Sequence, residues 1–224
     1  MILLTSPLIY ITFCILLQFF VEVKSQKTIF SPDSRDAHTA TFINDKLYIL
    51  GGEFFPSPAG KAKSPKETFL YLDVSVPFNT NELKWVDLTN KNIIPPHGFA
   101  ASIKGGENNN TLFLYGGESL NDEPMALVYT FDTQSNSWRI PTEITGILQT
   151  GKSGVTLTID YNNGMIYKFG GSVPTAYFND MLILDSINLS WKKASSINAP
   201  SPRNSYGAVF LPNRNIIYMG MYIF

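Results

Sequence analysis

Short apolar stretches separated by polar turns recur along the chain, and their pattern predicts β-strands. Four stretches align with one another: LYILGGE at 47–53, LFLYGGE at 112–118, IYKFGGS at 166–172 and IIYMGMY at 216–222. Each follows a β-branched run and a turn rich in Asn, Gly or Asp, which is typical of two antiparallel strands. Helical periodicity extends nowhere beyond a few residues. The pattern therefore predicts an all-β fold.

A further apolar stretch and a tryptophan complete each of the first three units. The stretches TFLYLD, LVYTFD and MLILDS precede Trp85, Trp138 and Trp191. In the first unit the insertion VSVPFNTNELK separates this stretch from its tryptophan. Each unit predicts a four-stranded antiparallel meander, which buries both faces only by stacking against its neighbours. Radial stacking of such sheets produces a propeller.

The recurring residues resemble the Kelch repeat over about residues 35 to 222. They are a paired glycine after the second strand, an aspartate in the third strand and a tryptophan at the start of the fourth. This resemblance implies an all-β, Kelch-type β-propeller segment of about three and a half four-stranded blades, with an incomplete ring. In that family the first strand of each blade lines the central channel, and the tryptophan packs between blades.

The resemblance assigns residues 26–224 to the propeller segment, with blades at about 35–90, 96–141 and 150–194 and a partial blade at 203–224. Met221 replaces the second glycine of the fourth unit, and the sequence ends before the third and fourth strands of that unit. A ring needs about four to eight blades. We therefore expect a fragment of a larger propeller, or two such halves paired into one ring, with an open strand edge at the apolar end.

The N-terminal residues predict an exported protein. Residues 1–25 are almost wholly apolar from Ile2 to Val23, which indicates a secretory signal peptide or an uncleaved N-terminal membrane anchor. The sequons at Asn109 and Asn188 lie in turn-like stretches and are predicted glycosylation sites. The expected localisation is therefore secreted or cell surface, with membrane contact only through the N-terminal segment if it is uncleaved.

Charge and one short motif bear on nucleotide and nucleic-acid binding. The charged fraction is 16% and the formal net charge is −1, so no nucleic-acid partner is expected. The octet GILQTGKS at 146–153 matches the phosphate-loop pattern. A phosphate loop needs a following helix, whereas VTLTIDYNNG predicts a strand and a turn. Nucleotide binding is therefore not expected.

Catalytic patterns are missing from the sequence. The sole cysteine, Cys14, lies in the leader, so the copper-radical site of galactose oxidase, which also uses a Kelch-type propeller, cannot form in the mature chain. His38 and His97 lack metal-ligand spacing, and His38 is expected to be a packed strand residue. We expect no catalytic residue, metal or cofactor, and predict that the chain is not an enzyme. The alternative is a secreted carbohydrate-active enzyme with catalytic groups partly in missing blades.

Candidate binding residues share one place in the repeat. Arg35, His97, Lys152 and Arg203 precede the first glycine of their units by similar intervals. They would lie in the loop entering each innermost strand, at one mouth of the channel. Two interpretations remain open: side chains that bond neighbouring backbone carbonyls between blades, or donors for a carboxylate, acidic peptide or sugar hydroxyl.

The loop at 53–66, EFFPSPAGKAKSPK, opens on the same mouth. Its Phe54 and Phe55 either anchor a partner or cover the sheet edge. The sequence thus favours an extracellular or membrane-tethered Kelch-repeat scaffold that recognises protein or carbohydrate through loops at one mouth of the propeller.

Overall fold

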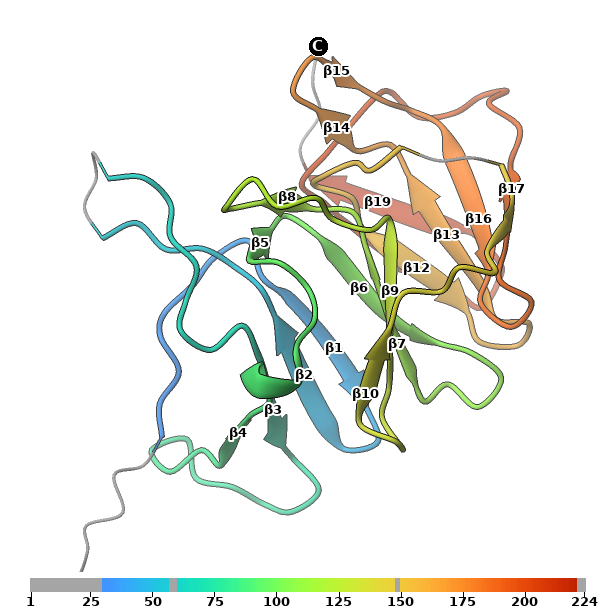
Figure 1. The fold of residues 1–224 in the computed structure, drawn as a ribbon. Coiled ribbons are helices and arrows are strands. Elements are labelled where there is room, and N and C mark those ends of the chain that lie inside the picture. Colours follow the sequence, from blue (N-terminus) through green and yellow to red (C-terminus); the bar gives the residue numbers. More distant parts are fainter. Residues whose placement is uncertain (1–29, 57–59, 148–149, 221–224) are drawn as a thin grey trace, which may run out of the picture. The chain divides into compact units, whose positions relative to one another are not determined.

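The computed structural model describes residues 30–56, 60–147 and 150–220 (Figure 1). These residues form strands and a single 3₁₀ helix, so the all-β prediction is confirmed. None of their helices is long or apolar enough to cross a membrane. The leader at 1–25 and Met221 lie outside the described residues. The expectations of a signal peptide or anchor, and of a replaced glycine at 221, therefore stay predictions.

The first blade is an antiparallel meander with the strand order β1-β2-β3-β4. Its strands are β1 (Thr39–Ile43), β2 (Lys46–Leu50), β3 (Phe69–Asp73) and β4 (Trp85–Asp87), followed by the 3₁₀ helix η1 (Thr89–Lys91). Asn44 and Asp45 connect β1 to β2 with φ angles of 49° and 58°. Two consecutive left-handed residues suit a two-residue hairpin turn, whose twist matches that of the flanking strands.

The second and third blades repeat this meander. The second contains β6 (Ala101–Gly105), β7 (Thr111–Tyr115), β9 (Val128–Asp132) and β10 (Ser137–Arg139), with the short pair β5 (His97–Gly98) and β8 (Glu118–Ser119) beside them. The third contains β12 (Leu157–Asp160), β13 (Met165–Phe169), β16 (Met181–Asp185) and β17 (Ser190–Lys193), with the short pair β14 (Ser172–Val173) and β15 (Ala176–Tyr177). The predicted strand after the GILQTGKS octet is therefore present as β12.

The third blade has a fifth strand that the sequence did not predict. β11 (Thr145–Gly146) pairs in parallel with β17, opposite Ser190 and Trp191. Gly146, the first residue of the GILQTGKS octet, therefore lies in a strand. Glycine is needed here for two reasons. A Cβ at this position would lie 2.2 Å from the Trp191 carbonyl oxygen, and the φ of 92° is one that other residues rarely adopt. The segment entering the third blade thus covers the outer edge of that sheet.

The last described element is the hairpin of β18 (Tyr206–Phe210) and β19 (Ile216–Gly220). Within the described residues β19 pairs only with β18. Its Ile217 and Met219 are 44% and 64% exposed. Within the described residues, β19 therefore forms the open apolar edge that the sequence predicted.

The innermost strands of consecutive blades are neighbours: β1 lies beside β6 and β6 beside β12 (Figure 1). In the same way β12 lies beside β18. Two apolar clusters fill the spaces between the first and second sheets and between the second and third. Trp138 packs on Phe69 of the preceding blade with ring centroids 5.2 Å apart, and Trp191 packs on Tyr115 at 5.8 Å. The predicted arrangement of an incomplete propeller with tryptophans between blades is confirmed.

Candidate functional site

The second strand of each blade ends at the same end of the sheets, which we call the mouth. β2 ends at Leu50, β7 at Tyr115 and β13 at Phe169, each directly before a pair of glycines. The loops that enter the innermost strands begin at this end as well. The mouth therefore collects two loops from each blade, and all four predicted binding positions lie there.

Hydrogen bonds at the mouth join consecutive blades through backbone atoms. The second glycine of each pair donates its N–H to a carbonyl of the next blade: Gly52 to His97 at 2.9 Å, Gly117 to Lys152 at 3.3 Å and Gly171 to Arg203 at 2.9 Å. These carbonyls belong to three of the four predicted binding residues. Their position therefore contributes one backbone hydrogen bond at each of these three junctions between blades, whatever side chain it carries.

The first glycine of each pair is required by the same contact. A Cβ at Gly51, Gly116 or Gly170 would lie 2.6, 2.1 or 2.7 Å from the same three carbonyl oxygens. The φ angles are 61°, 63° and 59°, which glycine adopts without steric cost. Close approach and left-handed backbone together explain why the strand ends in glycine in each blade.

The side chains of Arg35 and Lys152 turn to partners in their own blades. Arg35 Nη1 donates to the carbonyls of Gly51 at 3.3 Å and Glu67 at 2.5 Å, and Nη2 lies 3.6 Å from the Glu67 carboxylate. Lys152 Nζ donates to Asp180 Oδ1 at 2.6 Å and lies 3.9 Å from the centroid of the Phe178 ring. The positive charge of Arg35 is therefore paired with Glu67, and that of Lys152 with Asp180.

His97 and Arg203 also bond locally. His97 is 1% exposed, and its Nδ1 lies 2.8 Å from the Pro95 carbonyl oxygen. Burial lowers the pKa of His97, which favours the neutral ring. Arg203 Nε donates to the Ser201 carbonyl oxygen at 3.2 Å, and the guanidinium carbon lies 5.9 Å from the Tyr218 ring centroid.

The four predicted binding residues thus share a repeat position, but no contact brings two of their side chains together in the described structure. Each side chain bonds within its own blade, whereas the structural interpretation expected side-chain bonds between blades. The hydrogen bond between blades is instead accepted by the backbone carbonyl of His97, Lys152 and Arg203. Ligand binding by these four residues stays a prediction. His38 was expected to pack in a strand; it is exposed and lies one residue before β1, so that expectation is wrong.

A second set of polar residues at the mouth was missed from sequence, and we call it the polar ring. Its members are the residues after the paired glycines, Glu53, Glu118 and Ser172, and the residues after the predicted binding positions, Asp36, Gly98, Ser153 and Asn204. Backbone bridges pair them within blades as Asp36 with Glu53, Gly98 with Glu118, and Ser153 with Ser172. The signal in the sequence was the acid in GGE, repeated in the first two units.

Side chains of the polar ring connect consecutive blades. Ser153 Oγ donates to Glu118 Oε1 at 2.6 Å, and Asn204 Nδ2 donates to Ser172 Oγ at 3.1 Å. Glu53 is the equivalent residue of the first blade, and it faces Gly98, which has no side chain to donate. Burial raises the pKa of Glu53, and the charges of Asp36 and Glu118 raise it further.

A chain of backbone hydrogen bonds fixes the innermost part of the mouth. Phe99 donates to Ala37 at 2.9 Å, Gly154 to Phe99 at 3.0 Å and Ser205 to Gly154 at 2.7 Å. All four residues have φ between 48° and 63°. A bulky residue such as Phe99 rarely adopts this left-handed backbone conformation. The side chain of Phe99 is 39% exposed, so the mouth holds an aromatic ring near solvent.

The two adjacent phenylalanines of the loop at 53–66 differ in environment. Phe54 is half-buried and exchanges backbone hydrogen bonds of 2.9 Å with Lys63. Phe55 is 53% exposed. Phe54 therefore belongs to the loop's own backbone pairing, and Phe55 is the one available to a partner.

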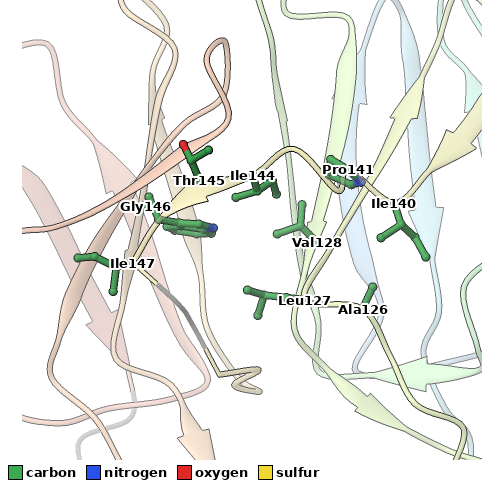
Figure 2. A pocket seen from close by; sticks show the side chains of 10 residues that line it. Ala126, Leu127, Val128, Ile140, Pro141, Ile144, Thr145, Gly146 and Ile147 are labelled. Atoms are coloured by element: carbon green, nitrogen blue, oxygen red, sulfur yellow. The ribbon is translucent and has the colours of Figure 1, made fainter.

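An apolar cavity of about 210 Å³ lies between the second and third blades, and no residue of the polar ring lines it. Figure 2 shows Leu127 and Val128 on one side of it and Gly146 and Ile147 on the other. Ile140, Pro141, Ile144 and Trp191 contribute further apolar surface. No titratable side chain lines this cavity, so it offers shape and hydrophobic contact but no acid–base chemistry.

The remaining predicted positions have clear surroundings. Lys152 of the GILQTGKS octet is paired with Asp180, and a strand follows Ser153, so the helix that a phosphate loop requires is replaced by β12.

Of the two predicted glycosylation sites, Asn188 is exposed and Asn109 is half-buried. Within the described ranges, no three His, Cys, Asp or Glu side chains are grouped to hold a metal ion.

Comparisons with known proteins agree with this geometry. Residues 37–222 match the family model described as the KLHDC2/KLHL20/DRC7 Kelch-repeats domain. The chain is 25% identical over 206 residues to Kelch repeat-containing protein 2 of Saccharomyces cerevisiae, covering 85% of this chain and 22% of that protein. It is 22% identical over 194 residues to Kelch domain-containing protein 3 of Rattus norvegicus, covering 82% and 47%. The chain therefore spans about half or less of the length of these relatives.

A solved structure, titled "Structure of YjhT", has a TM-score of 0.57 to this chain at 17% sequence identity. The similarity covers 80% of this chain and 57% of that one. At this identity the likeness concerns the fold alone, and it supports the stacking of blades described above.

Proposed function

Because this chain belongs to the KLHDC2/KLHL20/DRC7 Kelch-repeat family, we propose that it is a non-enzymatic scaffold that binds a protein partner through the loops of the mouth. Two exposed aromatic residues carry the proposal: Phe99, whose backbone is fixed by hydrogen bonds to Ala37 and Gly154, and Phe55, which follows the backbone pair of Phe54 and Lys63. Aromatic anchors dominate many protein interfaces, and a fixed backbone lowers the entropic cost of association.

Replacing both Phe55 and Phe99 by alanine is expected to weaken partner binding by at least about tenfold, because each loses apolar area at the interface. The measurement is quantitative affinity enrichment of partners from cells, followed by titration of the purified partner. Phe78→Ala is the matched control, since Phe78 is 48% exposed and lies in the β3–β4 connection at the opposite end of the strands. Equal loss of binding in both variants would contradict the proposal.

We also propose that the scaffold acts outside the cell or tethered to its surface. The apolar leader at 1–25 and the two sequons support this location. Carbohydrate is the alternative ligand class, and a glycan array probed with the same phenylalanine variants distinguishes it from a protein partner.

An exported chain is expected to carry an N-glycan on Asn188, which is exposed in the turn before β17. Its Nδ2 donates to Asp185 Oδ2 at 2.9 Å, and Asp185 also accepts from the backbone of Ile187, so the turn keeps its shape without the amide. Peptide N-glycosidase treatment of protein from secretory cells should increase its electrophoretic mobility. Asn188→Gln should reduce or abolish that shift and Asn163→Gln should not; an unglycosylated wild-type protein would count against export.

A further inference from the structure

The space beside Gly98 leaves one carboxylate of the polar ring without a partner. Glu53 is 6% exposed, and none of the described residues donates a hydrogen bond to its carboxylate. A Cβ placed on Gly98 would lie 3.8 Å from Glu53 Oε2. In the next blade the residue equivalent to Gly98 is Ser153, whose hydroxyl supplies the bond to Glu118.

The charges around Glu53 all have the same sign. Asp36 and Glu118 are both close enough to act on its carboxylate electrostatically. The nearby cations are engaged elsewhere, Arg35 with Glu67 and Lys152 with Asp180. The carboxylate has neither a donor nor a counter-charge, and its neighbours repel it, so an added cation would gain more here than at an isolated exposed acid.

We propose that this space is a subsite for a cationic side chain, lysine or arginine, of a protein partner, which enters the mouth and pairs with Glu53 beside Asp36 and Glu118. Phe99 is next in the chain to Gly98 and is 39% exposed, so we include its ring in the proposed contact with the same cation. An organic cation fits better than a metal ion, because these acids are not grouped as metal ligands within the described structure. The inference rests on the proposed scaffold function and names the chemistry that the scaffold selects.

Two substitutions test the subsite without disturbing the blades. Glu53→Gln removes the charge and keeps the size of the side chain. Gly98→Ser supplies the missing hydroxyl, and its Cβ would meet Ala37 Cβ at 3.4 Å, an ordinary contact distance. Glu107→Gln is the matched control, because Glu107 is an exposed acid in the β6–β7 turn at the other end of the strands.

The experiment selects a phage-displayed library of random decapeptides on the purified full chain and on each variant. We expect lysine or arginine to be enriched at one position on the wild-type chain and on Glu107→Gln. We expect a selected peptide to bind Glu53→Gln and Gly98→Ser at least about tenfold more weakly. Replacing its arginine by citrulline, or its lysine by acetyl-lysine, should cause a similar loss on the wild-type chain.

Different results would overturn different parts of the proposal. Peptides selected without a basic residue would overturn the cationic subsite and leave the scaffold function standing. Equal weakening by Glu107→Gln would reduce the effect to general charge attraction and overturn the subsite. If a folded Gly98→Ser chain binds the selected peptide with wild-type affinity, the subsite is also overturned. If no peptide is retained by the wild-type chain, the peptide-binding scaffold and the subsite both fail.

Discussion

Gly116→Ala is expected to lower the free energy of unfolding by about 3 kcal/mol or more. The new Cβ would lie 2.1 Å from the Lys152 carbonyl oxygen, which is far inside contact distance. That carbonyl cannot move away freely, because it accepts the Gly117 N–H at 3.3 Å. Alanine is also disfavoured at the φ of 63° that Gly116 adopts.

The measurement is denaturant unfolding followed by tryptophan fluorescence. Gly151→Ala is the matched control, since a Cβ at Gly151 would have no neighbour within 4 Å. The control should change the unfolding free energy by no more than about 0.5 kcal/mol. If the two variants are equally stable, the contact between Gly116 and the next blade does not have the importance that we assign to it.

Lys168→Met is expected to raise stability near neutral pH, by about 2 kcal/mol or more. Lys168 is 0% exposed, and its Nζ has no hydrogen-bond partner in the described structure. The ammonium lies over the Tyr115 ring, with the centroid 5.3 Å away, and the attraction of Asp180 offsets only part of the cost of its burial and of the Lys152 charge. Methionine fills a similar volume without a charge to desolvate.

The effect of this substitution should depend on pH in a defined direction. Burial, together with the charge of Lys152, lowers the pKa of Lys168 from 10.5 to about 7 in the folded chain. Between pH 7 and 10.5 the unfolded chain binds a proton that the folded chain does not, so wild-type stability rises with pH. Below pH 7 both states are protonated and the full penalty remains. The advantage of methionine should therefore be largest below pH 7 and should shrink toward pH 10.5.

Unfolding free energies at several pH values from 6 to 10 measure this dependence, using about one-unit steps. Lys193→Met provides the control, because Lys193 is an exposed lysine in β17. It should alter neither the stability nor its slope with pH by a comparable amount. A Lys168→Met advantage that is constant over this range would show that the amine does not titrate as its burial implies.

Local patterns predicted the blades well, because each strand and turn depends on residues close in sequence. Alternating apolar residues, the glycine pairs and the tryptophans were sufficient to predict the stacked meanders. β11 was missed because its partner, β17, lies about 45 residues later in the chain, and nothing in Thr145 or Gly146 reveals a parallel pairing. The pairing becomes visible only when the carbonyl of Trp191 is placed beside Gly146.

The mouth was harder to predict than the fold. The repeat alignment identified the position shared by Arg35, His97, Lys152 and Arg203, but it drew attention to their charge. The structure shows that the backbone carbonyl makes the contact between blades at three of these positions. The importance of Glu53 was also hidden, because it depends on a side chain that is absent from Gly98 in the neighbouring blade.

Joining blades through carbonyl oxygens has an evolutionary consequence. Every residue type supplies a carbonyl, so substitutions at this position can accumulate without altering how one blade docks on the next. Histidine, lysine and arginine already occupy it in successive blades of this chain. The residues on either side of it can then diversify in each blade independently, which allows new recognition surfaces to evolve on an unchanged framework.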